Sequence, residues 1–193
     1  MAKDRAFPRF LDLASLPDEY VIPSHLKPAT TWFDRLQPYG QLIESPQVTL
    51  QIRRINAGHY RLVGQMQADL SLQCQRCLDD FKQAVDRKLL FETVLSKQQA
   101  EAVEAPFEAI IFETSDQELD LIGLLEDELL LEIPLVPKHA DLKDCNQDML
   151  KRAKEYVAEQ EKPVQSKKNP FAVLEGFKVD MNTKKPDDSE AEN

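Results

Sequence analysis

The sequence predicts an α+β fold, an antiparallel β-sheet of three to five strands with one buried helix packed on a face. Two runs of alternating apolar residues between positions 48 and 72 predict the sheet. A dense apolar run at 118–137 predicts the helix. We expect an irregular N-terminal arm over residues 1–47 and a disordered acidic C-terminal tail over residues 178–193, where apolar anchors are missing.

The arm is distinguished by its prolines: Pro8, Pro17, Pro23, Pro28, Pro38 and Pro46. Proline fixes φ and lacks a backbone N–H, so it interrupts helices and sheet ladders. One helix is expected near Ala29–Leu36. Within it, Trp32 and Phe33 should pin the arm to the core.

The strands are predicted from residues that alternate between apolar and polar. A first strand begins at Val48, and the turn Asn56–His59 leads into a second strand, Tyr60–Leu72. Asn and Gly tolerate the positive φ that such a turn requires, which makes the pair a β-hairpin. Weaker alternation over Phe81–Leu95 suits a third strand, and the β-branched run Ala109–Phe112 suits a short further one.

The helix has recognisable ends. Asp120 can accept free backbone N–H groups as an N-cap, and Pro134 prevents continuation. Because apolar residues cover most of its surface, the helix should lie against the sheet. Its one polar patch, Glu126–Glu128, is interpreted as a solvated face. The alternative is a catalytic or magnesium-binding set, for which Glu128 and Glu132, one turn apart, are the pair that can converge.

The formal charge of −10 is concentrated in one segment. Of the 34 acidic side chains, 11 lie between Gln98 and Val136, where there is no Lys or Arg, and the other 23 are matched by 24 bases elsewhere. A net negative charge argues against nucleic-acid binding, but here that argument applies only to residues 98–136. Bases on the proposed strands either form a phosphate-binding sheet face or are ordinary surface residues: Arg53, Arg54, Arg61, Arg76, Lys82, Arg87 and Lys88.

Composition and motifs favour a cytoplasmic protein without catalytic machinery. No apolar run is long enough to span a membrane, and the first residues, MAKDRAFPRF, do not resemble a secretory signal. Gly-rich phosphate loops and nucleophile elbows are missing from the sequence. We therefore expect no enzyme activity, no small-molecule substrate and no membrane partner.

A secreted disulfide framework normally has an even and larger number of cysteines, and this chain has three. Cys74 and Cys77 form a C-x-x-C pair, which places two sulfurs on one side of a tight turn. A structural zinc site needs four ligands, and the natural second pair is His139 and Cys145. Two alternatives stay open: half-buried thiols with an unrelated surface histidine, and a redox-active C-x-x-C.

Beyond Cys145 the sequence predicts an exposed helix over Gln147–Glu161 and a linker over Lys162–Lys168. A short capped turn then begins, because Asn suits an N-cap and Pro suits the first helical position. This turn either docks into a partner or folds back on the core. The predicted partner-binding residues are Arg76, Asn169, Pro170 and Phe171.

Several segments together resemble the YceD-like family, also called large ribosomal RNA subunit accumulation proteins. They are LSLQCQRCLDDF at 70–81, the run at 118–139, Cys145, and NPFAVL at 169–174. The resemblance covers about residues 48–177, which we take as the YceD-like domain between the arm and the tail.

The resemblance implies a non-enzymatic factor needed for the synthesis, processing or accumulation of large-subunit (23S) ribosomal RNA in bacterial ribosome biogenesis. The implied partners are that RNA or its precursor, or large-subunit ribosomal proteins. It supplies no catalytic residues, and zinc is the one candidate cofactor. The alternative is a zinc-stapled protein-interaction module without an RNA role.

Overall fold

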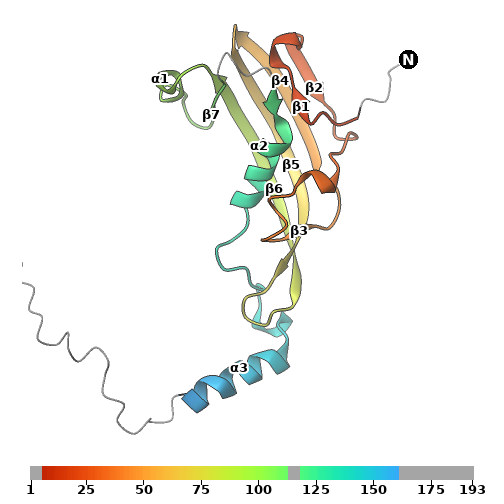
Figure 1. Cartoon of the computed structure of the whole chain (residues 1–193), viewed down its shortest axis with the longest axis vertical. Coiled ribbons are helices and arrows are strands. Elements are labelled where there is room, and N and C mark those ends of the chain that lie inside the picture. The colour runs from red at the N-terminus through yellow and green to blue at the C-terminus, as the bar shows by residue number, and fades with distance from the viewer. Residues whose placement is uncertain (1–5, 113–117, 161–193) are drawn as a thin grey trace, which may run out of the picture. The chain divides into compact units, whose positions relative to one another are not determined.

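The computed structural model describes residues 6–112 and 118–160 and has a mixed α+β fold. The chain divides into two units, Met1–Leu150 and Lys151–Asn193, and the description below concerns mainly the first. Its main sheet has six strands and a second sheet has two (Figure 1). The strands are β1 (Phe10–Leu11), β2 (Glu19–Ile22), β3 (Gln41–Leu42), β4 (Gln47–Asn56), β5 (His59–Gln73), β6 (Asp80–Val94), β7 (Glu108–Ile111) and β8 (Leu119–Asp120).

The described residues also form three α-helices and three 3-10 helices. The α-helices are α1 (Lys97–Ala100), α2 (Leu121–Leu131) and α3 (Gln147–Gln160), and the 3-10 helices are η1 (Leu13–Ser15), η2 (Thr30–Trp32) and η3 (Leu142–Asp144). Helix α3 crosses the boundary between the two units, and its side chains from Lys151 to Ala158 are exposed. None of the helices among the described residues is long and apolar enough to cross a membrane.

The predicted hairpin is formed by β4 and β5, which pair antiparallel. Gly58, at φ +76°, supplies the positive φ of the turn, and Asn56 pairs with His59 across it. Val48, Leu50 and Ile52 all point into the core, as their alternation predicts. Ile55 is exposed instead, because the register shifts between Arg54 and Asn56. The third predicted strand is β6, which pairs with β5 from Asp80 to Glu92.

Two features of the predicted sheet are wrong. The main sheet has six strands rather than three to five, and β7 runs parallel to β6 rather than antiparallel. A parallel pair needs a crossover connection, and the chain makes one through α1 before Glu108 pairs with Phe91. The short β-branched run that predicted β7 carries no information about the direction of the strand.

The N-terminal arm is more regular than predicted. It supplies β1, which pairs with β8; β2, which pairs with β4 at the sheet edge; and β3, which pairs with β5. The helix expected near Ala29–Leu36 is reduced to η2, whose two threonines are β-branched and disfavour a longer helix. Phe33 is nevertheless buried and Trp32 packs partly buried against the core, so the predicted anchoring role is confirmed.

Helix α2 lies on the sheet as predicted, and the Asp120 side chain accepts the Gly123 N–H at 2.9 Å as its N-cap. Its polar patch is not the solvated face that we expected. Glu126 is 4% exposed and Glu128 is 3% exposed, whereas Asp127 is exposed. The sequence does not show this because each buried carboxylate is neutralised by an arginine far away along the chain.

Arg35 of the arm neutralises Glu126, with its Nε donating to Oε2 at 2.9 Å. The Leu36 N–H donates to the other Glu126 oxygen at 3.0 Å. Arg87 of β6 donates to Glu128 at 2.5 Å and lies 3.6 Å from Glu132. Glu128 and Glu132 thus share one guanidinium. In the alternative considered from the sequence, these two carboxylates would instead bind a metal ion.

Arg87→Ala should lower the free energy of unfolding by about 3–5 kcal/mol, because the buried Glu128 carboxylate would lose its cation. Urea denaturation followed by circular dichroism measures the change. The matched control is Arg53→Ala, since exposed Arg53 lies 3.8 Å from exposed Glu19 and such pairs contribute about 0–1 kcal/mol. Similar losses in the two variants would contradict this account of α2.

Candidate metal centre

Cys74 and Cys77 lie in the tight connection between β5 and β6. The Cys74 N–H donates to the Asp79 carbonyl at 2.9 Å, and the Leu78 N–H donates to the Cys74 carbonyl at 2.8 Å. Leu78 has φ +66°, the left-handed region that few residues other than glycine adopt. This turn directs both thiols to the same side, where they are buried.

The second pair comes from the segment between α2 and α3, which is tied to the turn by backbone contacts. The Gln75 N–H donates to the Pro137 carbonyl at 2.8 Å, and the Arg76 guanidinium donates to the His139 carbonyl. The His139 ring packs on Phe81 of β6, with ring centroids 5.1 Å apart. Further along the chain, Asp141 caps η3, and Cys145 at the end of η3 lies beside the other three side chains.

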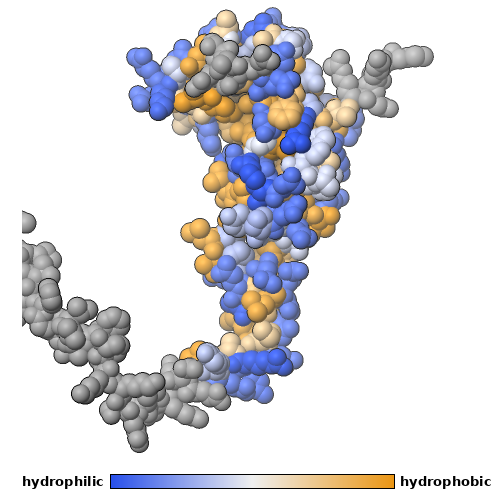
Figure 2. Space-filling view, in the orientation of Figure 1, coloured by the Kyte–Doolittle hydropathy of each residue, from blue (hydrophilic) through white to orange (hydrophobic). Residues whose placement is uncertain are grey.

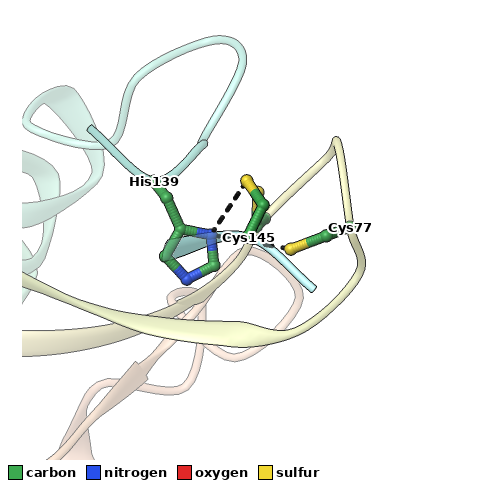
Figure 3. A group of neighbouring side chains, drawn as sticks. Cys77, His139 and Cys145 are labelled. Carbon is green, nitrogen blue, oxygen red and sulfur yellow. Dashed lines mark hydrogen bonds between the residues drawn. The ribbon is translucent and has the colours of Figure 1, made fainter. Parts of the chain in front are cut away.

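The four side chains converge on one point. Their ligand atoms all lie within 4.8 Å of one another, and the Cys74 and Cys145 sulfurs are 4.0 Å apart. His139 Nδ1 lies 3.6 Å from the sulfurs of both Cys77 and Cys145, and Figure 3 shows the ring directed at them. Metal–sulfur bonds of about 2.3 Å in a tetrahedron give edges of about 3.8 Å, close to these separations. The Cys3His cluster can therefore hold a metal ion.

The pKa values of two thiols in the site, Cys74 and Cys145, are shifted in opposite directions. Burial disfavours the Cys74 thiolate, but hydrogen bonds from the backbone N–H groups of His139, Arg76 and Cys77 outweigh it and lower the pKa of Cys74 to about 5. Burial raises the pKa of Cys145 to about 11, and hydrogen bonds with the other two thiols add to the effect. The site thus holds a stabilised thiolate beside a protonated thiol, and a cation would favour ionisation of the rest.

Arg76 lies between the two cysteines in the sequence, and its buried Nε has no hydrogen-bond partner among the described residues. Because it donates to the His139 carbonyl, its contact in the structure is with the metal centre, and its predicted role in partner binding stays a prediction. The other three predicted partner residues, Asn169, Pro170 and Phe171, lie outside the described residues.

The open face of the sheet is not the basic surface that we considered. Arg61 pairs with Glu92, Lys82 lies 2.7 Å from Asp69, and Arg53 pairs with an acid of β2. Burial opposes ionisation of Glu92, but hydrogen bonds from His59 and Arg61 lower its pKa below the usual value. Acids therefore offset three of the bases on this face, Arg53, Arg61 and Lys82.

Arg54 and Arg87 do not belong to the open face, because they lie on the covered face of the sheet. Arg54 donates to two carbonyls of the arm, those of Ala14 and Leu16, and Arg87 binds carboxylates of α2.

The sequence analysis did not identify two residues that support the Cys3His cluster, Phe81, which packs on His139, and Asp141, which caps η3. An Asp that precedes a short polar run is a capping signal that could have indicated the latter.

The left-handed turn residue gives a direct test of the geometry. At most positions a Gly variant is less stable than an Ala variant by about 0.5–1 kcal/mol. At position 78 the order should reverse, with Leu78→Gly more stable than Leu78→Ala by about 1 kcal/mol, because only alanine keeps the strain of positive φ. Thermal unfolding of the two variants measures this. The usual order, alanine above glycine, would show that Leu78 does not adopt this conformation.

A protein-family model matches a region of the chain that includes all four residues of the Cys3His cluster. The family model described as large ribosomal RNA subunit accumulation protein YceD matches residues 62–178, more than half of the chain. A protein of the same description from Haemophilus influenzae is 36% identical over 115 residues, which are 60% of this chain and 63% of that relative. No solved structure matches the chain. The resemblance seen in the sequence is thereby confirmed, and the chain belongs to the YceD family.

Proposed function

We propose that this chain is a non-enzymatic factor for the accumulation of large-subunit ribosomal RNA, acting in cytoplasmic ribosome assembly. The observation that carries the proposal is the family match over residues 62–178, which includes most of β5, all of β6 and α2, and the four residues of the Cys3His cluster. The described relative is named for large ribosomal RNA subunit accumulation, and the alignment covers 63% of its length.

The arrangement of charged side chains supports binding rather than catalysis. Glu126 and Glu128, the buried carboxylates of α2, are both engaged by arginines and serve the packing of the helix. The partners that fit the proposal are large-subunit RNA or its precursor, or large-subunit ribosomal proteins. The balanced open face of the sheet favours a protein partner over a phosphate backbone, which requires unpaired cations.

We also propose that the Cys3His cluster binds Zn²⁺. Three thiolates and an imidazole are a preferred donor set for zinc, and a centre with four protein ligands is structural rather than catalytic. When bound, the ion joins the β5–β6 turn to the segment between α2 and α3. This centre also supports the second candidate function, a zinc-stapled protein-interaction module without an RNA role.

Protein purified without chelator should contain about one zinc per chain, as measured by elemental analysis. His139→Ala should reduce that content, whereas His25→Ala, at an exposed histidine outside the cluster, should leave it unchanged. Lowering the pH from about 7 to about 5 should release the ion, since protons compete for the thiolates and the imidazole. Zinc near zero in the unaltered protein at neutral pH would refute the metal assignment.

Deletion of the gene should lower the ratio of large-subunit to small-subunit RNA, with the small-subunit RNA little changed. Quantifying both RNAs across a sucrose gradient, and probing the same fractions for this protein, measures the effect and its location. Restoration by the unaltered gene is the control. An unchanged ratio would reject the proposed function and leave the zinc-stapled module as the better account.

A further inference from the structure

The three cysteines of the Cys3His cluster come from two segments that lie far apart along the chain. Cys74 and Cys77 are three positions apart in the β5–β6 turn, whereas Cys145 follows η3, 71 positions after Cys74. All three are free thiols, and all three are buried. Two thiols can be oxidised together to one disulfide, so a cluster of three can form one disulfide and keep one thiol.

The geometry points to the pair of thiols that joins the two segments. The Cys74 and Cys145 sulfurs are 4.0 Å apart, and a disulfide bond is about 2.0 Å long, so the sulfurs have to approach each other by about 2 Å. Cys77 would remain as the thiol, with His139 Nδ1 3.6 Å from its sulfur. The redox-active C-x-x-C considered from the sequence would instead join Cys74 to Cys77.

The backbone around the cluster lets Cys145 make this approach. The β5–β6 turn holds Cys74, whose N–H donates to the Asp79 carbonyl at 2.9 Å and whose carbonyl accepts the Leu78 N–H at 2.8 Å. Cys145 ends η3, a helix of three residues of which none is buried, so a small shift of η3 disturbs little packing.

The side of Cys145 is also where a small oxidant can enter. Cys145 is 3% exposed, whereas Cys74 and Cys77 are fully buried. The residues of η3 are exposed, and Figure 2 shows mainly hydrophilic surface where α3 begins. Hydrogen peroxide is little larger than water and needs only a small opening. We therefore expect it to reach the cluster from this side.

Oxidation of this pair is incompatible with a bound metal ion. A thiolate is the metal ligand, and a disulfide contains none. Once Cys74 and Cys145 are joined, only Cys77 and His139 remain of the cluster, which is half of the set that a structural zinc ion requires. The link between the β5–β6 turn and the segment after α2 would thus change from metal coordination to a covalent bond.

We propose that Cys74 and Cys145 form a reversible disulfide on oxidation by hydrogen peroxide, with release of any bound metal ion. The first sulfur attacks one peroxide oxygen, the O–O bond breaks, and a sulfenic acid forms as hydroxide leaves. The second sulfur attacks the sulfenic sulfur, the S–S bond forms, and another hydroxide leaves. Each hydroxide takes up one thiol proton, so two thiols and one peroxide give one disulfide and two waters. The inference rests on the proposed zinc site only for the release of the ion.

The test is treatment of the full-length, metal-free chain with hydrogen peroxide, followed by alkylation of free thiols and mass spectrometry of a non-reduced digest. The peptides of Cys74 and Cys145 should be joined, and Cys77 should be alkylated. Dithiothreitol should then restore all three thiols. A sample loaded with zinc beforehand should release about one ion per disulfide formed, as measured with a chromogenic chelator.

The matched control is the same chain unfolded in urea before oxidation. Without the fold, closing the short loop between Cys74 and Cys77 is favoured over closing the 71-residue separation between Cys74 and Cys145. The unfolded chain should therefore give mainly the Cys74–Cys77 disulfide, and the folded chain mainly the Cys74–Cys145 disulfide. This reversal would show that the tertiary structure selects the pair.

Four results for the folded chain would overturn the inference. They are a disulfide between Cys74 and Cys77, a disulfide between two chains, oxidation to sulfinic or sulfonic acids without a disulfide, and three thiols that do not react. None of these bears on the ribosomal RNA ratio in the deletion strain or on the zinc content of the purified protein. The modification site, the metal assignment and the proposed function can therefore fail separately.

Discussion

Helix α2 can lie on the sheet only because each of its two buried carboxylates meets an arginine from another element. An unpaired carboxylate in such a position would cost several kcal/mol. Glu126 and Glu128 are two positions apart and therefore point about 200° apart around the helix axis. One meets Arg35 of the arm and the other meets Arg87 of β6, so the two ion pairs fix the rotation of α2 and tie the arm to the core.

This constraint explains why a proline-rich arm becomes part of the fold. Arg35 contacts α2 through the carboxylates of Glu126 and Asp127 and also donates to the Gly123 carbonyl at 2.9 Å. Next to it, Phe33 and Leu36 enter the main hydrophobic cluster. The arm thus contributes a cation and two large apolar side chains to one place, and its short strands β1, β2 and β3 pair with strands of the two sheets.

The metal centre forms a second, much smaller cluster of three buried cysteines with Phe81, Met149 and Leu150 packed around them. Phe81 also packs against the main cluster, so it connects the two. So few residues bury little apolar surface, and a structural metal is the usual way to stabilise a region of this kind. The Gln75 N–H of the same turn donates to the Pro137 carbonyl, which ties the segment after α2 to this cluster.

The sequence by itself determined the family, the β4–β5 hairpin with its glycine turn, the capped helix α2 and the four residues that the structure brings together as the Cys3His cluster. These features depend on local signals: alternation, Gly58, the Asp120 cap and the C-x-x-C spacing. Only the tertiary structure decided the parallel direction of β7, the burial of Glu126 and Glu128, and the exposure of Leu135. Each of these depends on which distant residue lies opposite, such as Arg35 for Glu126, and spacing along the chain carries no information about that partner.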